Sequence, residues 1–417
     1  MSKEKILNLV YKNKVLVENF AYMALLQVFI MAYPLITYPY LVEVLGREIY
    51  GVFLTAQVLV SYVSLFVDFG SNFVCTKHIS LNRDNPLKLA SILSNVLAVR
   101  FVIFVILFLV YSLIILIVPQ YSKYKVIYLL TFGFVTNELF FPQFFFQGLE
   151  KMKLISIINV ITKIILLPFI FILVKNANDV YMVPIIYSFG FFIGGLISLY
   201  YIRFILKLKF VRPSLKESIY YIKDCSSVFA TDLICTVKDK FNYFFVGSML
   251  GMSEVVIYDL GVKLYTLAAK PYIIICTVLF PRLAKSRNLN HVKNTVLFTF
   301  LITLIVIVLA NLFLNEIVLF FLNEQIDLFP IRLFLFAPLI LSVSYVISNN
   351  FFVAFGYNKY LFYSIVFTTI VYVMLLISCY FFNFLNNVTI FVMISIVSFS
   401  VELIYRLFLV RKICKNK

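Results

Sequence analysis

The chain has 417 residues, of which 63% are hydrophobic and 13% are charged, and its formal net charge is +17. A soluble globular protein carries roughly a quarter of charged residues, so this composition excludes a water-soluble fold. A nucleic-acid partner is not expected either, because the cations lie mainly in loops between hydrophobic segments rather than on a soluble face.

Hydrophobic segments of membrane-spanning length follow one another along the whole chain. A hydrocarbon core about 30 Å thick needs about 20 apolar residues for each helical crossing. We predict an all-α integral membrane protein with about twelve transmembrane helices, at 17–43, 52–75, 90–118, 126–148, 154–174, 181–206, 225–250, 256–280, 295–321, 329–356, 360–385 and 388–410.

The distribution of cations predicts the orientation. Of the 36 Lys and Arg residues, 23 lie in the two terminal segments and after even-numbered spans, whereas 4 follow odd-numbered spans. Cytoplasmic loops of membrane proteins collect positive charge, so both termini are expected in the cytoplasm. The polar start of the chain shows no small-residue cleavage site, and no cleaved signal peptide is expected.

The longest basic connection, 207–224, separates six predicted spans from six. We therefore expect an N-terminal lobe at 1–206 and a C-terminal lobe at 225–417. A weak internal repeat agrees with this division, because the Leu-Gly and Ile-Tyr pairs at 45–50 recur at 250–258. Parallel repeats of this kind are common among transporters.

Metal, disulfide and nucleotide chemistry are not indicated. The six cysteines occur singly, without CxxC spacing. His78 and His291 fall in basic loops, where a solvated surface histidine is expected. No GxxxxGKS/T motif is present, so neither a cofactor, a metal nor ATP hydrolysis is expected.

The span at 225–250 contains Asp232, Lys238, Asp239 and Lys240. At about 3 kcal/mol for each charge, these residues cost roughly 12 kcal/mol in lipid, more than the apolar residues of the span return. They must therefore face water or partner groups inside the protein. Lys238 and Lys240 point about 200° apart, so they cannot both face one cavity squarely.

Other polar residues recur at helical spacing and predict a cavity between the lobes. Asp259, Lys263, Thr266 and Lys270 form one stripe at i, i+4, i+7 and i+11. Similar stripes contain Asp68 with Asn72 and Asn159 with Lys163. Two interpretations stay open for some of these charges: Asp259 and Lys263 form either a structural ion pair or part of the cavity wall, and Arg100 either bridges helices or binds ligand. Arg203, Arg332 and Arg406 lie near span ends and are expected to snorkel to the interface.

A cavity lined chiefly by lysine suits an anionic ligand such as phosphate or pyrophosphate. The predicted substrate-binding residues are Lys163, Lys238, Lys240, Lys263, Lys270 and Arg100. The embedded acids that would carry protons or sodium ions for coupling are Asp68, Glu138, Asp239 and Asp259. The neutral polar lining consists of Asn72, Asn159 and Thr266.

Three strings carry a family resemblance. PLITYPYLVEVLGREIYGVFLTAQVLVSYVSLFVDFG at 34–70, PQFFFQGLEKMK at 142–153 and the stretch at 253–287 that ends in LFPRLAKSR resemble the Wzx-type polysaccharide repeat-unit flippases. Arg47 departs from the proline that the family often has there, and Gln143-Phe144 replaces a common Glu-Trp. If that glutamate serves ion coupling in relatives, Glu138 would have to substitute for it.

The resemblance implies a MATE-like fold of two six-helix lobes around a cationic lumen, as in the multidrug, oligosaccharidyl-lipid and polysaccharide exporter superfamily. It implies a bacterial inner-membrane flippase that moves an undecaprenyl-pyrophosphate-linked oligosaccharide outward for O-antigen or capsule assembly. A polysaccharide polymerase and a chain-length regulator are the implied protein partners.

Two alternatives stay open. A cation-coupled drug exporter of the same superfamily should expose more acid than base in its cavity, contrary to the lysine excess here. A membrane-embedded polysaccharide polymerase needs a sizeable external loop with catalytic charges, whereas the predicted external loops are short. Alternating access between the two lobes is the mechanism that we expect.

Overall fold

The computed structural model describes residues 14–415, which are helical almost throughout, with no strand among them. Nine helical segments in this range are long and apolar enough to cross a membrane: Ala32–Leu81, Pro86–Ile117, Met152–Leu173, Ala177–Ile205, Met252–Phe280, Leu289–Leu312, Phe329–Val353, Asn358–Phe381 and Val388–Lys415. The prediction of an all-α, multi-pass membrane protein is confirmed. The number of twelve crossings and the cytoplasmic position of the termini stay predictions.

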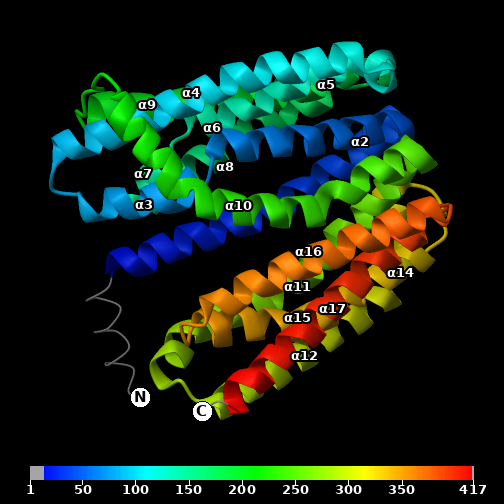
Figure 1. The fold of residues 1–417 in the computed structure, drawn as a ribbon. Helices are drawn as coiled ribbons and strands as arrows, with labels where there is room; N and C mark the ends of the chain where they lie inside the picture. The colour runs from blue at the N-terminus through cyan, green and yellow to red at the C-terminus, as the bar shows by residue number, and fades with distance from the viewer. Residues whose placement is uncertain (1–13, 416–417) are drawn as a thin grey trace. The chain divides into compact units, whose positions relative to one another are not determined.

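The described residues form two compact units, 14–233 (unit 1) and 234–415 (unit 2) (Figure 1). Unit 1 contains α2 (Lys14–Asp68), α3 (Ser71–Leu81), α4 (Pro86–Ile117), α5 (Lys125–Thr131), α6 (Thr136–Phe140), α7 (Gln143–Gly148), α8 (Met152–Leu173), α9 (Met182–Tyr200) and the first part of α10 (Leu215–Phe245). Unit 2 contains the rest of α10, α11 (Met252–Ser286), α12 (Leu289–Leu312), α13 (Leu314–Leu322), α14 (Phe329–Phe334), α15 (Ala337–Tyr345), α16 (Asn358–Phe381) and α17 (Val388–Lys415). Short 3₁₀ turns at Pro119–Tyr124, Phe132–Val135 and Ala177–Tyr181 and π-helical turns at Tyr201–Ile205, Val246–Leu250 and Val346–Val353 complete the helical path.

Two of the predicted spans at the start of the chain form one helix, α2, with a sharp turn inside it. The backbone leaves helical geometry at Gly46, where φ is 74° and ψ is 158°. This conformation is open essentially to glycine alone. The two arms of α2 run back from this turn as a hairpin (Figure 1).

The predicted span at 126–148 is broken into α5, a 3₁₀ turn, α6 and α7. The main interruption lies at Phe141, whose backbone is extended at φ −105° and ψ 91°. Pro142 follows it, and a proline both lacks an amide hydrogen and disfavours helical geometry in the residue before it. The break therefore has a local cause that sequence hydropathy does not register.

The first part of α10 belongs to unit 1 because polar residues fix it to α4. The carboxylate of Glu217 accepts hydrogen bonds from the Ser91 hydroxyl and, at 3.2 Å, from Lys88 Nζ. Asn95 Nδ2 donates to the same carboxylate at 2.9 Å. The hydrogen bonds from Ser91 and then Lys88 hold the pKa of Glu217 below its ordinary value, although burial acts in the opposite direction. The boundary between the two compact units lies inside α10, after Leu233.

The α10 helix also lies close to the start of α3. His78 Nε2 lies 2.7 Å from Asp224 Oδ2. At Gly70, where φ is +77°, an added Cβ would lie 3.0 Å from the main-chain oxygen of Cys225 and 3.0 Å from the amide nitrogen of Phe229. Glycine at this position therefore permits both the turn before α3 and the close approach of α10.

Each unit has its own hydrophobic core. The core of unit 1 includes Phe144, Phe145 and Phe146 of α7, which are all at most 1% exposed, together with Cys75 and Cys225. The core of unit 2 joins α11, α12, α17 and the π-helical turn before α16, through buried residues that include Leu283, Val292, Phe352, Leu409 and Ile413.

Gly70→Ala should destabilise unit 1 in two ways. A left-handed backbone costs an L-residue about 1 to 2 kcal/mol, and the new methyl group additionally pushes against the backbone of α10. Gly356→Ala is the matched control, since φ there is +86° but no atom lies within 4 Å of the added Cβ. Thermal unfolding in detergent should show a larger fall in the midpoint for Gly70→Ala, and equal falls would contradict the close approach.

Candidate functional site

A buried arginine network joins four elements of unit 1. Arg100 on α4 is 0% exposed. Its Nη2 donates to Asp68 Oδ1 at 2.5 Å, to Ser71 Oγ at 2.7 Å and to Asn72 Oδ1 at 3.1 Å. Its Nη1 donates to the main-chain oxygen of Glu138 at 2.6 Å. Through these hydrogen bonds Arg100 connects α2, α3, α4 and α6. We therefore do not include it among the proposed substrate contacts.

The position of Asp68 follows from the sharp turn at the start of α3. Asp68 is the last residue of α2, and its Oδ1 accepts the Asn72 amide hydrogen at 3.2 Å and the Ser71 hydroxyl at 3.1 Å. A carboxylate at a helix N-terminus is stabilised by the free amide hydrogens and by the helix dipole. The same carboxylate is therefore held by α3 on one side and by Arg100 on the other.

This network contains two carboxylates for one guanidinium. Asp68 forms the ion pair with Arg100. The carboxylate of Glu138 accepts only amide hydrogen bonds among the described residues, from Asn72 at 3.3 Å and from Asn137 at 3.3 Å. With every group ionised, the cluster carries one excess negative charge. An excess charge of this kind inside a membrane protein is costly unless a proton or a cation neutralises it.

Lys163 on α8 lines a small cavity inside unit 1, together with Asn159, Tyr33 and Tyr187. The ammonium nitrogen lies 5.8 Å from the ring centroid of Tyr33, a cation–π arrangement. The cavity volume is about 20 Å³, which is room for about one water molecule. Lys163 and Asn159 thus share one space, but a phosphate group fits there only if the neighbouring helices move.

A second buried cluster of charges holds unit 2 together. Glu402 on α17 binds Lys238 Nζ at 2.7 Å and Arg406 Nη2 at 2.6 Å. Arg406 Nη1 also donates to the Ser344 hydroxyl at 2.8 Å, and its Nε donates to the Ser364 hydroxyl at 3.2 Å. Arg406 is only 5% exposed, so the prediction that it snorkels to the interface is wrong. The prediction fails because Glu402, one helical turn earlier, gives the Arg406 guanidinium a partner inside the unit.

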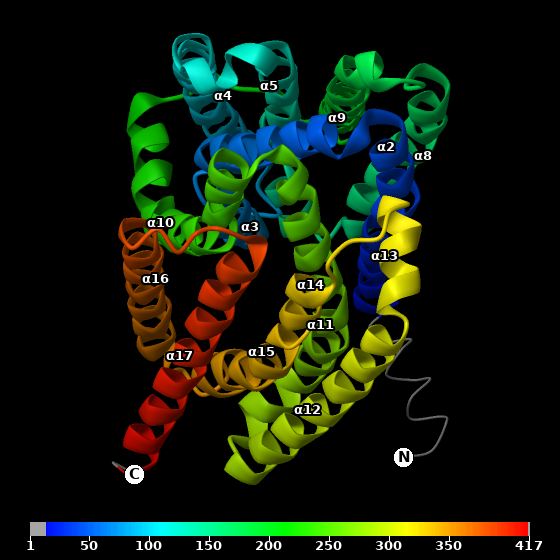
Figure 2. The ribbon, with the colours of Figure 1, turned by 90° about the vertical axis from the view of Figure 1, so that its right-hand side faces the viewer.

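Asn242 forms a neutral polar centre in unit 2 that joins α10, α11, α16 and α17. Figure 2 shows the ribbons of these helices. Its Nδ2 donates to Tyr258 Oη at 2.9 Å and to Ser395 Oγ at 3.0 Å. The Tyr372 hydroxyl donates to Asn242 Oδ1 at 2.5 Å. The sequence reasoning missed this centre, because its four residues lie far apart in the chain and none of them is charged.

The polar stripe of α11 is partly occupied by contacts within unit 2. Asp259 is buried, and it accepts the Tyr243 hydroxyl at 2.8 Å and an ion-paired hydrogen bond from Lys263. Thr266 is exposed and donates to the Val262 main-chain oxygen at 2.7 Å. The ion pair between Asp259 and Lys263 is therefore formed, and Thr266 and Lys270 continue the stripe along α11.

The predicted cations fall into two groups. Arg100, Lys238 and Lys263 each form an ion pair within their own unit. No carboxylate oxygen among the described residues lies within 4.0 Å of the remaining three. These three are Lys163, Lys240 and Lys270, and each of them is half-buried. Asp239, beside Lys240, is exposed.

Replacing Arg100 tests whether it is structural. Arg100→Met should cost about 3 to 5 kcal/mol of stability, since it leaves the half-buried Asp68 carboxylate without its partner. The double variant Arg100→Met with Asp68→Asn removes both charges of the ion pair and should recover part of that loss. Thermal midpoints of the two purified variants check this, and a single variant as stable as the unchanged chain would remove the network from its structural role.

The comparisons with known proteins agree with this architecture. The polysaccharide biosynthesis protein family model matches residues 16–287. A relative named "Putative O-antigen transporter" from Escherichia coli (strain K12) is 27% identical over 288 residues, which cover 67% of each chain.

Two solved structures resemble the fold at low sequence identity. An inward-facing multidrug resistance MATE family transporter of the MOP superfamily superimposes with a TM-score of 0.66 at 14% identity, over 92% of this chain and 96% of that one. The lipid II flippase MurJ gives a TM-score of 0.66 at 13% identity, over 93% of this chain and 87% of that one. The predicted MATE-like fold is confirmed. The family model extends over more than half of this chain, and the chain therefore belongs to the polysaccharide biosynthesis protein family.

Proposed function

We propose that this protein is a flippase that moves a lipid-linked oligosaccharide repeat unit across the bacterial cytoplasmic membrane. Membership of the polysaccharide biosynthesis protein family and the similarity to a relative named as an O-antigen transporter support this function. The observation that supports it is the set of three half-buried lysines, Lys163, Lys240 and Lys270, without carboxylate partners within 4.0 Å among the described residues.

The chemistry of these lysines favours a phosphate-bearing ligand. An ammonium group inside a membrane protein is costly unless a partner or water neutralises it. Unit 2 adds to this demand, because its buried cluster contains two cations, Lys238 and Arg406, for the single carboxylate of Glu402. A pyrophosphate that links sugar to lipid would supply the missing negative charge, and lysine binds it as a movable point charge. The substrate we infer is an undecaprenyl-pyrophosphate-linked oligosaccharide.

We assign the substrate contacts to Lys163, Lys240 and Lys270, with Lys263 available once its pairing with Asp259 exchanges. Transport would proceed by alternating access, in which the phosphate reaches the cations from one leaflet and leaves toward the other. The lipid tail would remain in the bilayer, so the protein has to shelter only the charged and sugar-bearing part of the substrate.

Glu138 is the residue that we propose for ion coupling. Asp68 forms an ion pair with Arg100 and Asp259 one with Lys263, whereas no Lys, Arg or His nitrogen among the described residues lies within 4.0 Å of the Glu138 carboxylate. A proton or a sodium ion taken up there would remove the excess charge and leave the hydrogen bonds of Arg100 intact. Asp239 is a second acid that such an ion would reach, since it is exposed.

Neutralising the lysines should reduce transport without unfolding the protein. Lys240→Gln and Lys270→Gln are each expected to lower the rate of flipping roughly 10-fold or more, which corresponds to one lost hydrogen bond to a charged group. The assay follows translocation of a lipid-linked oligosaccharide in liposomes that contain the purified chain.

Two controls accompany this prediction. Lys175→Gln removes an exposed lysine between α8 and α9 and should leave flipping unchanged. Lys238→Gln removes the partner of Glu402 and should instead lower the thermal midpoint, although it lies only two residues from Lys240. Unimpaired flipping by both Lys240→Gln and Lys270→Gln would reject the assignment of these residues.

Replacing Glu138 tests the coupling proposal. Glu138→Gln keeps the shape of the side chain but removes the charge that an ion would neutralise, so flipping by this variant should no longer respond to an imposed proton or sodium gradient. Glu316→Gln is the control, since this acid is exposed outside the cluster. If Glu138→Gln responds to both gradients as the unchanged chain does, coupling does not depend on this residue.

A further inference from the structure

The turn between α11 and α12 has a groove beside it that the proposed function does not use. The groove has a volume of about 240 Å³ and lies between the end of α11 and the start of α12. Its lining combines Leu279, Leu283 and Phe298 with the polar residues His291 and Asn294. It is therefore polar near the turn and apolar farther along the two helices.

The direction of the groove follows from helix geometry. Arg287 and Asn288 form the turn, and Leu279 on α11 and Phe298 on α12 lie roughly 12 to 15 Å from it along the helix axes. Phe298 is 53% exposed and Val278 is 60% exposed. Large apolar side chains on the surface of a membrane helix face lipid, so the apolar end of the groove opens to the bilayer.

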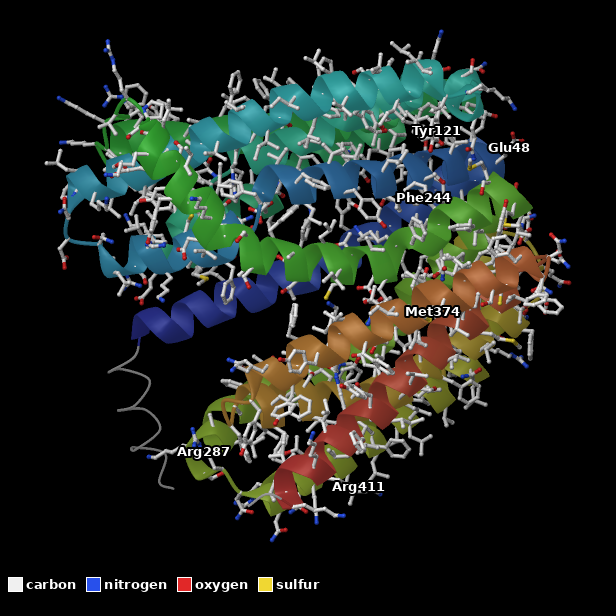
Figure 3. All side chains as sticks on the ribbon, in the orientation of Figure 1. Glu48, Tyr121, Phe244, Arg287, Met374 and Arg411 are labelled. Carbon is white, nitrogen blue, oxygen red and sulfur yellow. The ribbon has the colours of Figure 1, made fainter. Side chains whose placement is uncertain are left out.

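The charge at the polar end has one sign. Between residues 260 and 315 the sequence contains six Lys and Arg and no Asp or Glu. Lys285, Arg287 and Lys293 are exposed at or beside the turn, and no carboxylate among the described residues lies within 4.0 Å of them. Figure 3 shows Arg287 at the tip of the α11–α12 pair. These exposed cations are therefore accessible to anions from outside the protein.

The other end of the same helices provides a contrast. A second apolar groove in unit 2, near the end of α12, contains Arg332 and Asn311. The connection there carries Glu316, Glu324 and Asp327, so its charges are mixed. Of these two grooves in the described part of unit 2, the one at the α11–α12 turn combines an apolar channel with an end whose charges are all basic.

We propose that this groove is a binding site for an anionic phospholipid of the bilayer. One acyl chain would lie along Leu279, Leu283 and Phe298, and the phosphate would be bound by Lys285, Arg287 and Lys293 with hydrogen bonds from His291 and Asn294. Basic residues beside membrane helices attract acidic lipids in this way. The LFPRLAKSR string at 279–287, which the transport site leaves without a role, supplies one wall of the site and two of its cations.

The absence of tryptophan from the chain gives a direct assay. Phe298→Trp places a single fluorophore in the apolar wall at an exposed position. In purified full-length protein, phosphatidylglycerol with brominated acyl chains should quench this fluorescence at a lower mole fraction than brominated phosphatidylcholine with the same chains. Native mass spectrometry of the unchanged chain provides a second measurement that needs no substitution, and it should retain bound phosphatidylglycerol.

Charge variants identify the site. In the Phe298→Trp background, Lys285→Gln with Lys293→Gln should weaken phosphatidylglycerol binding about 25-fold, or about fivefold for each cation. The matched control is Lys209→Gln with Lys216→Gln, which removes one exposed cation before α10 and one in its first turn and should leave quenching unchanged.

Four results would overturn the proposal. These are equal quenching by the two lipids, equal losses in the charge pair and its control, full competition by inorganic phosphate alone, and binding of a polyprenyl phosphate but not of phosphatidylglycerol. None of these measurements follows transport, so they test the lipid site independently of the flippase function.

Discussion

A charge in the interior of a membrane must find a partner inside the protein or in water, and this constraint organises both units. In unit 1 it gathers α2, α3, α4 and α6 around the guanidinium of Arg100. In unit 2 it gathers α10, α15, α16 and α17 around Glu402 and Arg406. Apolar contacts between helices gain little over contacts with lipid, so these polar networks specify which helices pack together.

The same constraint separates the cations that are ion-paired within their unit from those that are not. Lys238 and Lys240 are two residues apart on α10, yet only Lys238 reaches a carboxylate. Different faces of one helix thus differ in their contacts: Lys238 holds unit 2 together, whereas Lys240 is one of the lysines to which we propose a substrate contact. The Arg100 cluster of unit 1 contains one carboxylate more than cations, and the Glu402 cluster of unit 2 contains one cation more than carboxylates. In our proposal the first imbalance suits a coupling ion and the second suits a phosphate.

The sequence predicted what local chemistry determines. Hydropathy gave the helices, and the spacing of Asp259 and Lys263 allowed their ion pair to be considered, because i and i+4 residues are neighbours in any helix. It did not predict that Lys238 meets Glu402, since these residues are 164 positions apart and only the fold brings them together. The Asn242 centre was missed for the same reason, and the break at Phe141 because hydropathy ignores the backbone conformation before a proline.

The attachment of α10 to α4 has a consequence for biosynthesis. A chain that emerges from the ribosome can complete unit 1 only when Glu217 and Asp224 have been made, because these residues bind side chains of α4 and α3. The hydrophobic segments made earlier would therefore wait in the bilayer without the contacts of Lys88, Ser91 and Asn95 to Glu217. Folding of unit 1 is thus coupled to synthesis of α10, the helix that the two units share.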